Sequence, residues 1–136
     1  MKRIPIRVVQ ALVAVLALTF VAAGLWAMID PRSFSLNAAP FPPYNAHLFH
    51  DIGAFLIGLG TCLAAGLLFG DALLVVLVGN TFGGVAHFIA HVVDRDQGGH
   101  ATDLFIFGFV ALLLIVLTVA RATTTGSHIG QRPAGR

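Results

Sequence analysis

Histidine and aspartate side chains gather near one end of two long apolar segments. Neutral imidazole is the commonest ligand of transition metals in proteins, and carboxylates complete many such sites. A His-x-x-x-His pair places both rings on one side of a helix, and this chain adds a second pair, spaced by three residues, on a neighbouring segment. We therefore predict a metal site formed by His47, His50, Asp51, His87, His91 and Asp94.

A donor set without a thiolate favours Zn, Fe or Cu(II) over Cu(I). Haem b is an alternative cofactor, clamped by one histidine from each segment, with Gly83 and Gly84 leaving room for the flat macrocycle. Electron transfer to or from a quinone would then follow, so the site would be redox-active. We name three further polar residues as candidates for contact with a cofactor: Tyr44, Asn45 and Asn80.

Helical spacing predicts that these donors face one another. At about 100° per residue, His47, His50 and Asp51 share a face above Ala54, Gly58, Thr61 and Ala65. In the next segment, Asn80, Gly83, Gly84, His87, His91 and Asp94 form one stripe. Small residues let helices approach closely in lipid, so we expect both stripes to face the interior and their polar ends to meet.

Two interpretations without a cofactor stay open. Aspartate and histidine chains inside helical bundles can relay protons. Hydrogen bonds between the same groups can also fix helix packing only, in which case the protein would be a non-enzymatic accessory or structural membrane subunit. The sequence indicates no reaction, so we assign no catalytic residue.

Composition identifies the environment of these residues. Of 136 residues, 57% are hydrophobic and only 10% are charged, with a mean hydropathy of +0.90. A soluble domain carries about 25% charged residues, so we expect a membrane protein with the lipid bilayer as its main partner. The net charge of +2 comes from a few basic residues and predicts no nucleic-acid binding, and the single Cys62 excludes an internal disulfide.

Four apolar segments are long enough to cross a bilayer, which requires about 20 residues per helix. They cover about 6–29, 44–69, 72–93 and 102–120. Short connections predict an all-α fold, a single antiparallel bundle of four transmembrane helices within residues 1–122. Asp30 followed by Pro31 predicts the start of a short extra helix. Residues 123–136 are expected to form a disordered cytoplasmic tail.

Positive charge predicts the orientation in the membrane. Six of the eight basic residues lie on the side of the two termini, and Arg32 and Arg95 lie on the other side. The six basic residues are Lys2, Arg3, Arg7, Arg121, Arg132 and Arg136. Both termini are therefore expected in the cytoplasm.

The glycine-containing faces of the helices could also pair two copies of the chain or bind another membrane protein.

Residues 43–54, which read Pro-Tyr-Asn-Ala-His-Leu-Phe-His-Asp-Ile-Gly-Ala, resemble a signature of an uncharacterised family of small four-helix bacterial integral membrane proteins. That family also carries His-x-x-x-His on its third helix, matched here by His87 and His91. The resemblance covers about residues 30–120 and extends distantly to DoxX-like proteins. It implies a four-helix fold in a bacterial inner membrane and gives most weight to Tyr44, Asn45, His47, Asp51, His87 and His91.

Overall fold

The computed structural model describes residues 4–129, with side chains up to Thr124, and this part of the chain is entirely helical apart from turns and loops. Four of its helices are long and apolar enough to cross a membrane, as expected of an integral membrane protein. The prediction of an all-α bundle of four transmembrane helices is therefore confirmed. The helices are α1 (Ile6–Ile29), α2 (Pro31–Asn37), α3 (Ala46–Leu68), α4 (Leu73–Val93) and α5 (Asp103–Ile129).

Local sequence signals set the helix starts. The Asp30 carboxylate accepts the backbone N–H of Ser33 at 3.0 Å, and Pro31 occupies the first helical position, where its missing N–H costs nothing. The predicted short helix is thus confirmed as α2. The Asn45 side chain caps α3 by accepting the N–H groups of His47 and Leu48 at 3.0 and 3.4 Å.

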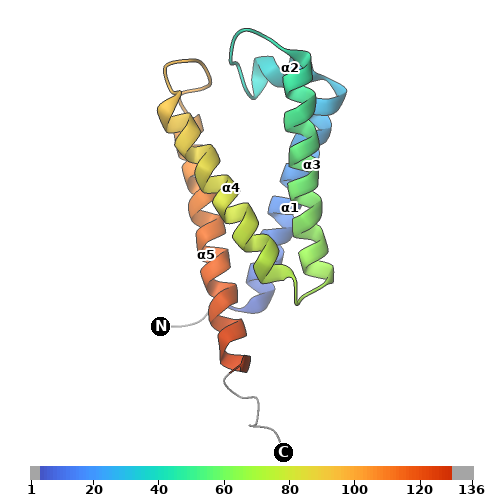
Figure 1. Ribbon diagram of the computed structural model, residues 1–136, viewed down its shortest axis with the longest axis vertical. Coiled ribbons are helices and arrows are strands. Elements are labelled where there is room, and N and C mark those ends of the chain that lie inside the picture. The colour runs from blue at the N-terminus through green and yellow to red at the C-terminus, as the bar shows by residue number, and fades with distance from the viewer. Residues whose placement is uncertain (1–3, 130–136) are drawn as a thin grey trace, which may run out of the picture.

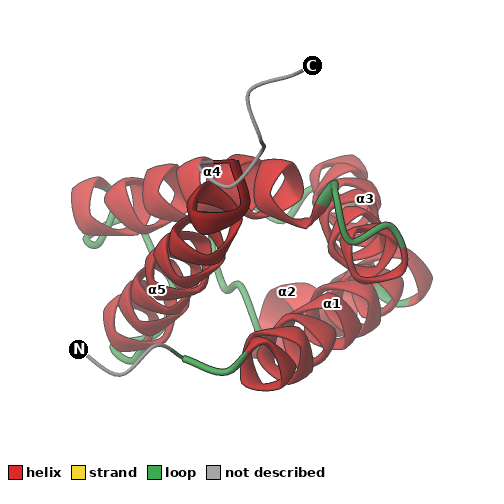
Figure 2. Cartoon of the chain, turned by 90° about the horizontal axis from the view of Figure 1, so that it is seen from below, coloured by secondary structure: helices red, strands yellow, loops and turns green. Residues whose placement is uncertain are grey.

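The long helices form two antiparallel hairpins, α1 with α3 and α4 with α5 (Figures 1 and 2). Glycine brings α1 and α3 into backbone contact. A Cβ atom on Gly24 would lie 2.7 Å from the carbonyl oxygen of Gly53, and one on Gly60 would lie 2.7 Å from that of Ala17. In α4 and α5, the hydroxyls of Thr81 and Thr118 are hydrogen-bonded at 2.7 Å.

The two hairpins share a core at one end of the molecule, near the 69–72 turn, which we call the closed end. Arg121 of α5 donates to the carbonyl oxygen of Gly70 in that turn at 2.9 Å. Leucine and valine side chains from all four long helices fill the space between them. This core consists of Val9, Val13, Leu16, Ala17, Leu63, Leu73, Leu77, Leu114 and Leu117, each at most 6% exposed.

At the opposite end, the open end, the hairpins diverge (Figure 1). There a loop of one hairpin contacts a loop of the other. The backbone N–H of Gly99 donates to the Pro40 carbonyl at 3.2 Å, and the His100 ring lies 3.2 Å from the Asn37 carbonyl oxygen. Gly99 has a φ of +84°, which favours glycine. The open end is thus held by the 38–45 segment and the 94–102 loop.

The helix boundaries agree closely with the sequence prediction, with one difference. The last helix continues to Ile129 instead of ending near Ala120, and its membrane-spanning part is Asp103–Thr124. Residues 123–129, expected in a disordered tail, are therefore helical. No proline occurs between Asp103, where this helix begins, and Pro133, so the helix can extend beyond its apolar part. The rest of the expected tail, 130–136, lies outside the described residues.

Candidate functional site

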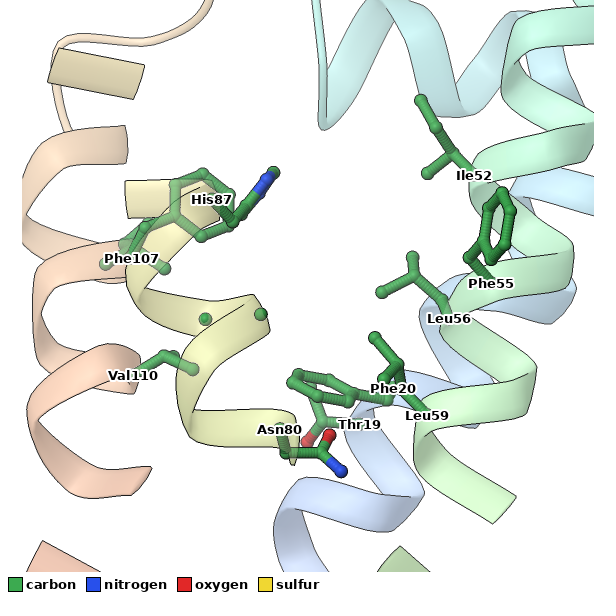
Figure 3. Close-up of a pocket in the computed structure, with 13 residues that line it drawn as sticks. Thr19, Phe20, Ile52, Phe55, Leu56, Leu59, Asn80, His87, Phe107 and Val110 are labelled. Atoms are coloured by element: carbon green, nitrogen blue, oxygen red, sulfur yellow. The ribbon is translucent and has the colours of Figure 1, made fainter. Parts of the chain in front are cut away.

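A cleft of about 410 Å³ lies between the two hairpins, above the closed end (Figure 3). Phe55 and Ile106 line it and are nevertheless 75% and 53% exposed, so the cleft opens onto the lipid-facing surface. Its volume is within the range of about 300–1,000 Å³ typical of small-molecule sites. The lining residues are Thr19, Phe20, Ile52, Phe55, Leu56, Leu59, Asn80, Gly83, Gly84, His87, Ile106, Phe107 and Val110.

The two walls of the cleft differ in chemistry. The α3 wall presents carbon only, from Ile52, Phe55, Leu56 and Leu59. The α4 wall carries one polar side chain near each of its two ends, His87 toward the open end and Asn80 toward the closed end (Figure 3). Any molecule in the cleft is therefore enclosed by hydrocarbon and fixed by few polar contacts.

His87 belongs to a compact group near the open end. Its ring meets that of His91 edge to face, with centroids 4.7 Å apart, and Phe107 of α5 contacts both rings. His91 Nδ1 lies 3.9 Å from Asp103 Oδ2, and these two side chains are 13% and 9% exposed. Asp103 also accepts the backbone N–H of His100 at 2.8 Å. The Asp103 carboxylate thus lies beside His91, while His87 points into the cleft (Figure 3).

A smaller polar pocket of about 260 Å³ lies on the other side of His91, at the open end. His91, Arg95, His100 and Asp103 are among its lining residues. The buried face of His91 therefore separates this polar pocket from the His87 side of the cleft.

The candidate residues of α3 do not join this group. His47 and Asp51 pair with each other at 3.6 Å, and their side chains are 84% and 53% exposed. His50 is exposed as well. The reason is the rotation of α3: Phe49 and Gly53 are the residues that pack against α1 and α2, so the faces bearing His47, His50 and Asp51 point elsewhere.

Tyr44, Asn45 and Asp94 also lie outside the cleft. The Tyr44 ring stacks on Phe49 with centroids 5.8 Å apart, and Asn45 is the α3 cap described above. Asp94 ends α4 and accepts the side-chain amide of Gln97 at 2.9 Å. Of the three residues proposed to contact a cofactor, Asn80 alone lines the cleft.

The expected meeting of donors from α3 and α4 is thus absent from the described part of the chain. Among those residues, no group of three or more His, Cys, Asp or Glu side chains is arranged to hold a metal ion. Metal binding itself stays a prediction, with His87 and His91 as the donors that lie together.

Sequence reasoning did not predict the apolar side of the site. Phe20, Phe55 and Phe107 line the cleft, but a phenylalanine in an apolar segment faces lipid equally well, so no signal distinguishes them. Asp103 is different, because the sequence predicts it at the level of the histidines: an acidic residue at the start of an apolar helix is costly unless it has a partner. The structure confirms that it lies beside His91.

Comparison of the chain with family models, curated proteins and solved structures finds no match.

Proposed function

We propose that this integral membrane protein binds a small apolar molecule from the bilayer in the cleft between its two hairpins. The observation that carries the proposal is the cleft itself, about 410 Å³ in volume and lined by side chains of all four long helices. Hydrocarbon surrounds the membrane-spanning part of the chain, so an apolar cleft that opens there takes up apolar molecules rather than water.

His87 supplies the polar contact near the open end. In its neutral form the imidazole has one donor and one acceptor nitrogen, and it is the sole ionisable side chain among the described residues that line the cleft. The rings of His91 and Phe107 contact it edge to face, and Asp103 lies beside His91. A polar group at the end of the ligand nearer the open end would contact His87.

Photolabelling tests the proposal. We would incubate the purified protein in phosphatidylcholine vesicles with farnesyl methyl ether that carries a diazirine, irradiate it, and map the labelled peptides. Labels on Phe55 or Leu56 of α3 together with Phe107 of α5 are the expected result, because these residues line opposite walls of the cleft.

Two glycine variants test whether labelling depends on the cleft: one fills the cleft and the other is its matched control. A side chain on Gly83 would meet nothing within 4 Å and would enter the cleft, so Gly83→Leu should reduce labelling at least tenfold. Gly79 on the same helix also has open space, but it does not line the cleft, so Gly79→Leu should label like the original protein. Equal labelling of both variants, or labels spread evenly over lipid-facing residues, would overturn the proposal.

A transition metal is a second candidate ligand, favoured by the contact between the His87 and His91 rings with Asp103 behind them. It ranks below the apolar ligand because the opposite wall of the cleft offers no donor from α3. The same wall disfavours a haem held between two histidines. Elemental analysis of untagged protein would test it: bound Zn, Fe or Cu should be lost in the His87→Ala, His91→Ala double variant.

We further propose an inner-membrane location with both termini cytoplasmic. The excess of basic residues at the two ends of the chain supports this orientation. It would place the open end, with Arg32 and Arg95, on the external side of the membrane. Cysteine introduced at Ser33 and labelled from outside with a membrane-impermeant maleimide would test this orientation, since Cys62 lies within α3 and does not interfere from either surface.

A further inference from the structure

The deep part of the cleft contains a polar atom without a partner. Asn80 is only 4% exposed, and no described group donates a hydrogen bond to its Oδ1 atom. From Leu73, the first residue of α4, to Asn80 the helix rises by about 10 Å. Asn80 therefore lies well inside the membrane-spanning segment, where an unpaired acceptor is unfavourable.

The orientation of the Asn80 amide is fixed by its own helix. Its Nδ2 atom donates to the carbonyl oxygen of Val76 at 2.9 Å. Exchanging the two amide atoms would bring an oxygen against that carbonyl oxygen and lose the bond. Oδ1 therefore remains the atom that needs a donor.

Thr19 of α1, also at the deep end of the cleft, shows the same pattern (Figure 3). Its hydroxyl donates to the Val15 carbonyl at 2.9 Å. The Thr19 hydroxyl hydrogen and one N–H of the Asn80 amide are thus used by backbone carbonyls of their own helices. The buried polar atom of these two side chains that is left without any partner in the described part of the chain is the acceptor Asn80 Oδ1.

From this pattern we infer that the ligand of the cleft is an apolar molecule with a hydroxyl or N–H group, which donates to Asn80 Oδ1 at the deep end. The inference rests on the proposed function. Gly83 lies one turn above Asn80 and has no side chain to obstruct the approach to this part of α4. Phe20 and Leu59 supply the apolar surface at the same end of the cleft (Figure 3).

Two probes that differ by one donor test the inference. Tritiated farnesol carries an O–H group, and tritiated farnesyl methyl ether replaces it with O–CH₃. Binding to the detergent-solubilised protein, measured by rapid gel filtration, should be about tenfold tighter for farnesol, as expected for one hydrogen bond in an apolar site. In Asn80→Leu, which has a similar volume and no acceptor, the two probes should bind equally.

The ratio of the two affinities does not depend on the fraction of protein that is folded, because both probes are measured on the same sample. Thr19→Val is the second variant and should lower the ratio less than Asn80→Leu does. Equal binding of both probes to the original protein would overturn the inference and leave the proposed function standing. Failure of both probes to bind, or binding that Gly83→Leu does not reduce, would overturn the proposed function as well.

Discussion

The same four long helices pack closely together at the closed end of the molecule and diverge toward the open end. At the closed end, residues such as Leu77 and Leu114 are fully buried between the hairpins. Toward the open end, the hairpins separate, and the residues between them line a cleft or remain exposed, as Phe55 does. The contacts across the open end involve one loop of each hairpin, through the backbone hydrogen bond between Gly99 and Pro40 and the Phe41 ring against His91.

This difference assigns stability and binding to different parts of the chain. A helix pair in lipid gains stability from close side-chain packing, because lipid tails are as apolar as leucine. The closed end provides such packing between hairpins, whereas the cleft region does not. Variants at the closed end should therefore change the free energy of unfolding, and variants in the cleft should change ligand binding.

The largest effect is expected from a cavity in the closed-end core. Leu77→Ala removes a side chain with no exposed surface and should lower the free energy of unfolding by about 2–5 kcal/mol. Phe55→Ala removes a larger side chain that is 75% exposed, and should change it by no more than about 0.5 kcal/mol. Unfolding in detergent followed by circular dichroism gives both values, and equal losses would contradict the distinction between the two ends.

A glycine pair should give effects of opposite sign. Gly60→Ala brings a Cβ atom to 2.7 Å from the Ala17 carbonyl oxygen, so α1 and α3 must separate, at a cost of about 1–3 kcal/mol. Gly83→Ala meets open space and should stabilise the protein by up to about 1 kcal/mol through helix propensity. The same unfolding experiment measures both, and a stabilising Gly60→Ala would mean that α1 and α3 are not in backbone contact.

The fold could be predicted from the sequence further than the site could. The bilayer sets the length of each span, and Asp30 with Pro31 and Asn45 mark helix starts, so the spans were predicted to within a few residues except at the end of α5. The rotation of α3 could not be predicted. Small residues occur on two of its faces, and the structure packs Gly53 and Gly60 against α1 rather than the face with Ala54 and Gly58.

That rotation decides which histidines belong to the site. On α4, the stripe with Asn80, Gly83 and His87 was predicted to face inward, and these residues line the cleft. On α3, the polar residues were assumed to face the same interior because charged groups are costly in lipid. At the end of a helix this cost is small, so the exposed pair of His47 and Asp51 needs no buried partner.

A medium effect is expected at the buried carboxylate of α5. Asp103→Ala removes the acceptor of the His100 N–H and the partner of His91, and should cost about 1–2 kcal/mol. Asp103→Asn keeps an acceptor oxygen and should lose about half as much. As a matched control, Asp51→Ala breaks an exposed His–Asp pair and should cost less than about 0.5 kcal/mol. Similar losses for Asp51→Ala and Asp103→Ala would contradict the different burial of the two pairs.

The smallest effect is expected at Asn80, where one substitution should raise the free energy of unfolding and weaken ligand binding. Asn80→Leu removes an acceptor without a partner and should raise the free energy of unfolding by about 1 kcal/mol, even though the Val76 hydrogen bond is lost. Added farnesol should then stabilise the original protein more than the variant, because a ligand stabilises the folded state in proportion to the logarithm of its concentration over Kd. A variant that unfolds more easily without ligand would show that Oδ1 already has a partner within the protein, and the reason for a donor-bearing ligand would disappear.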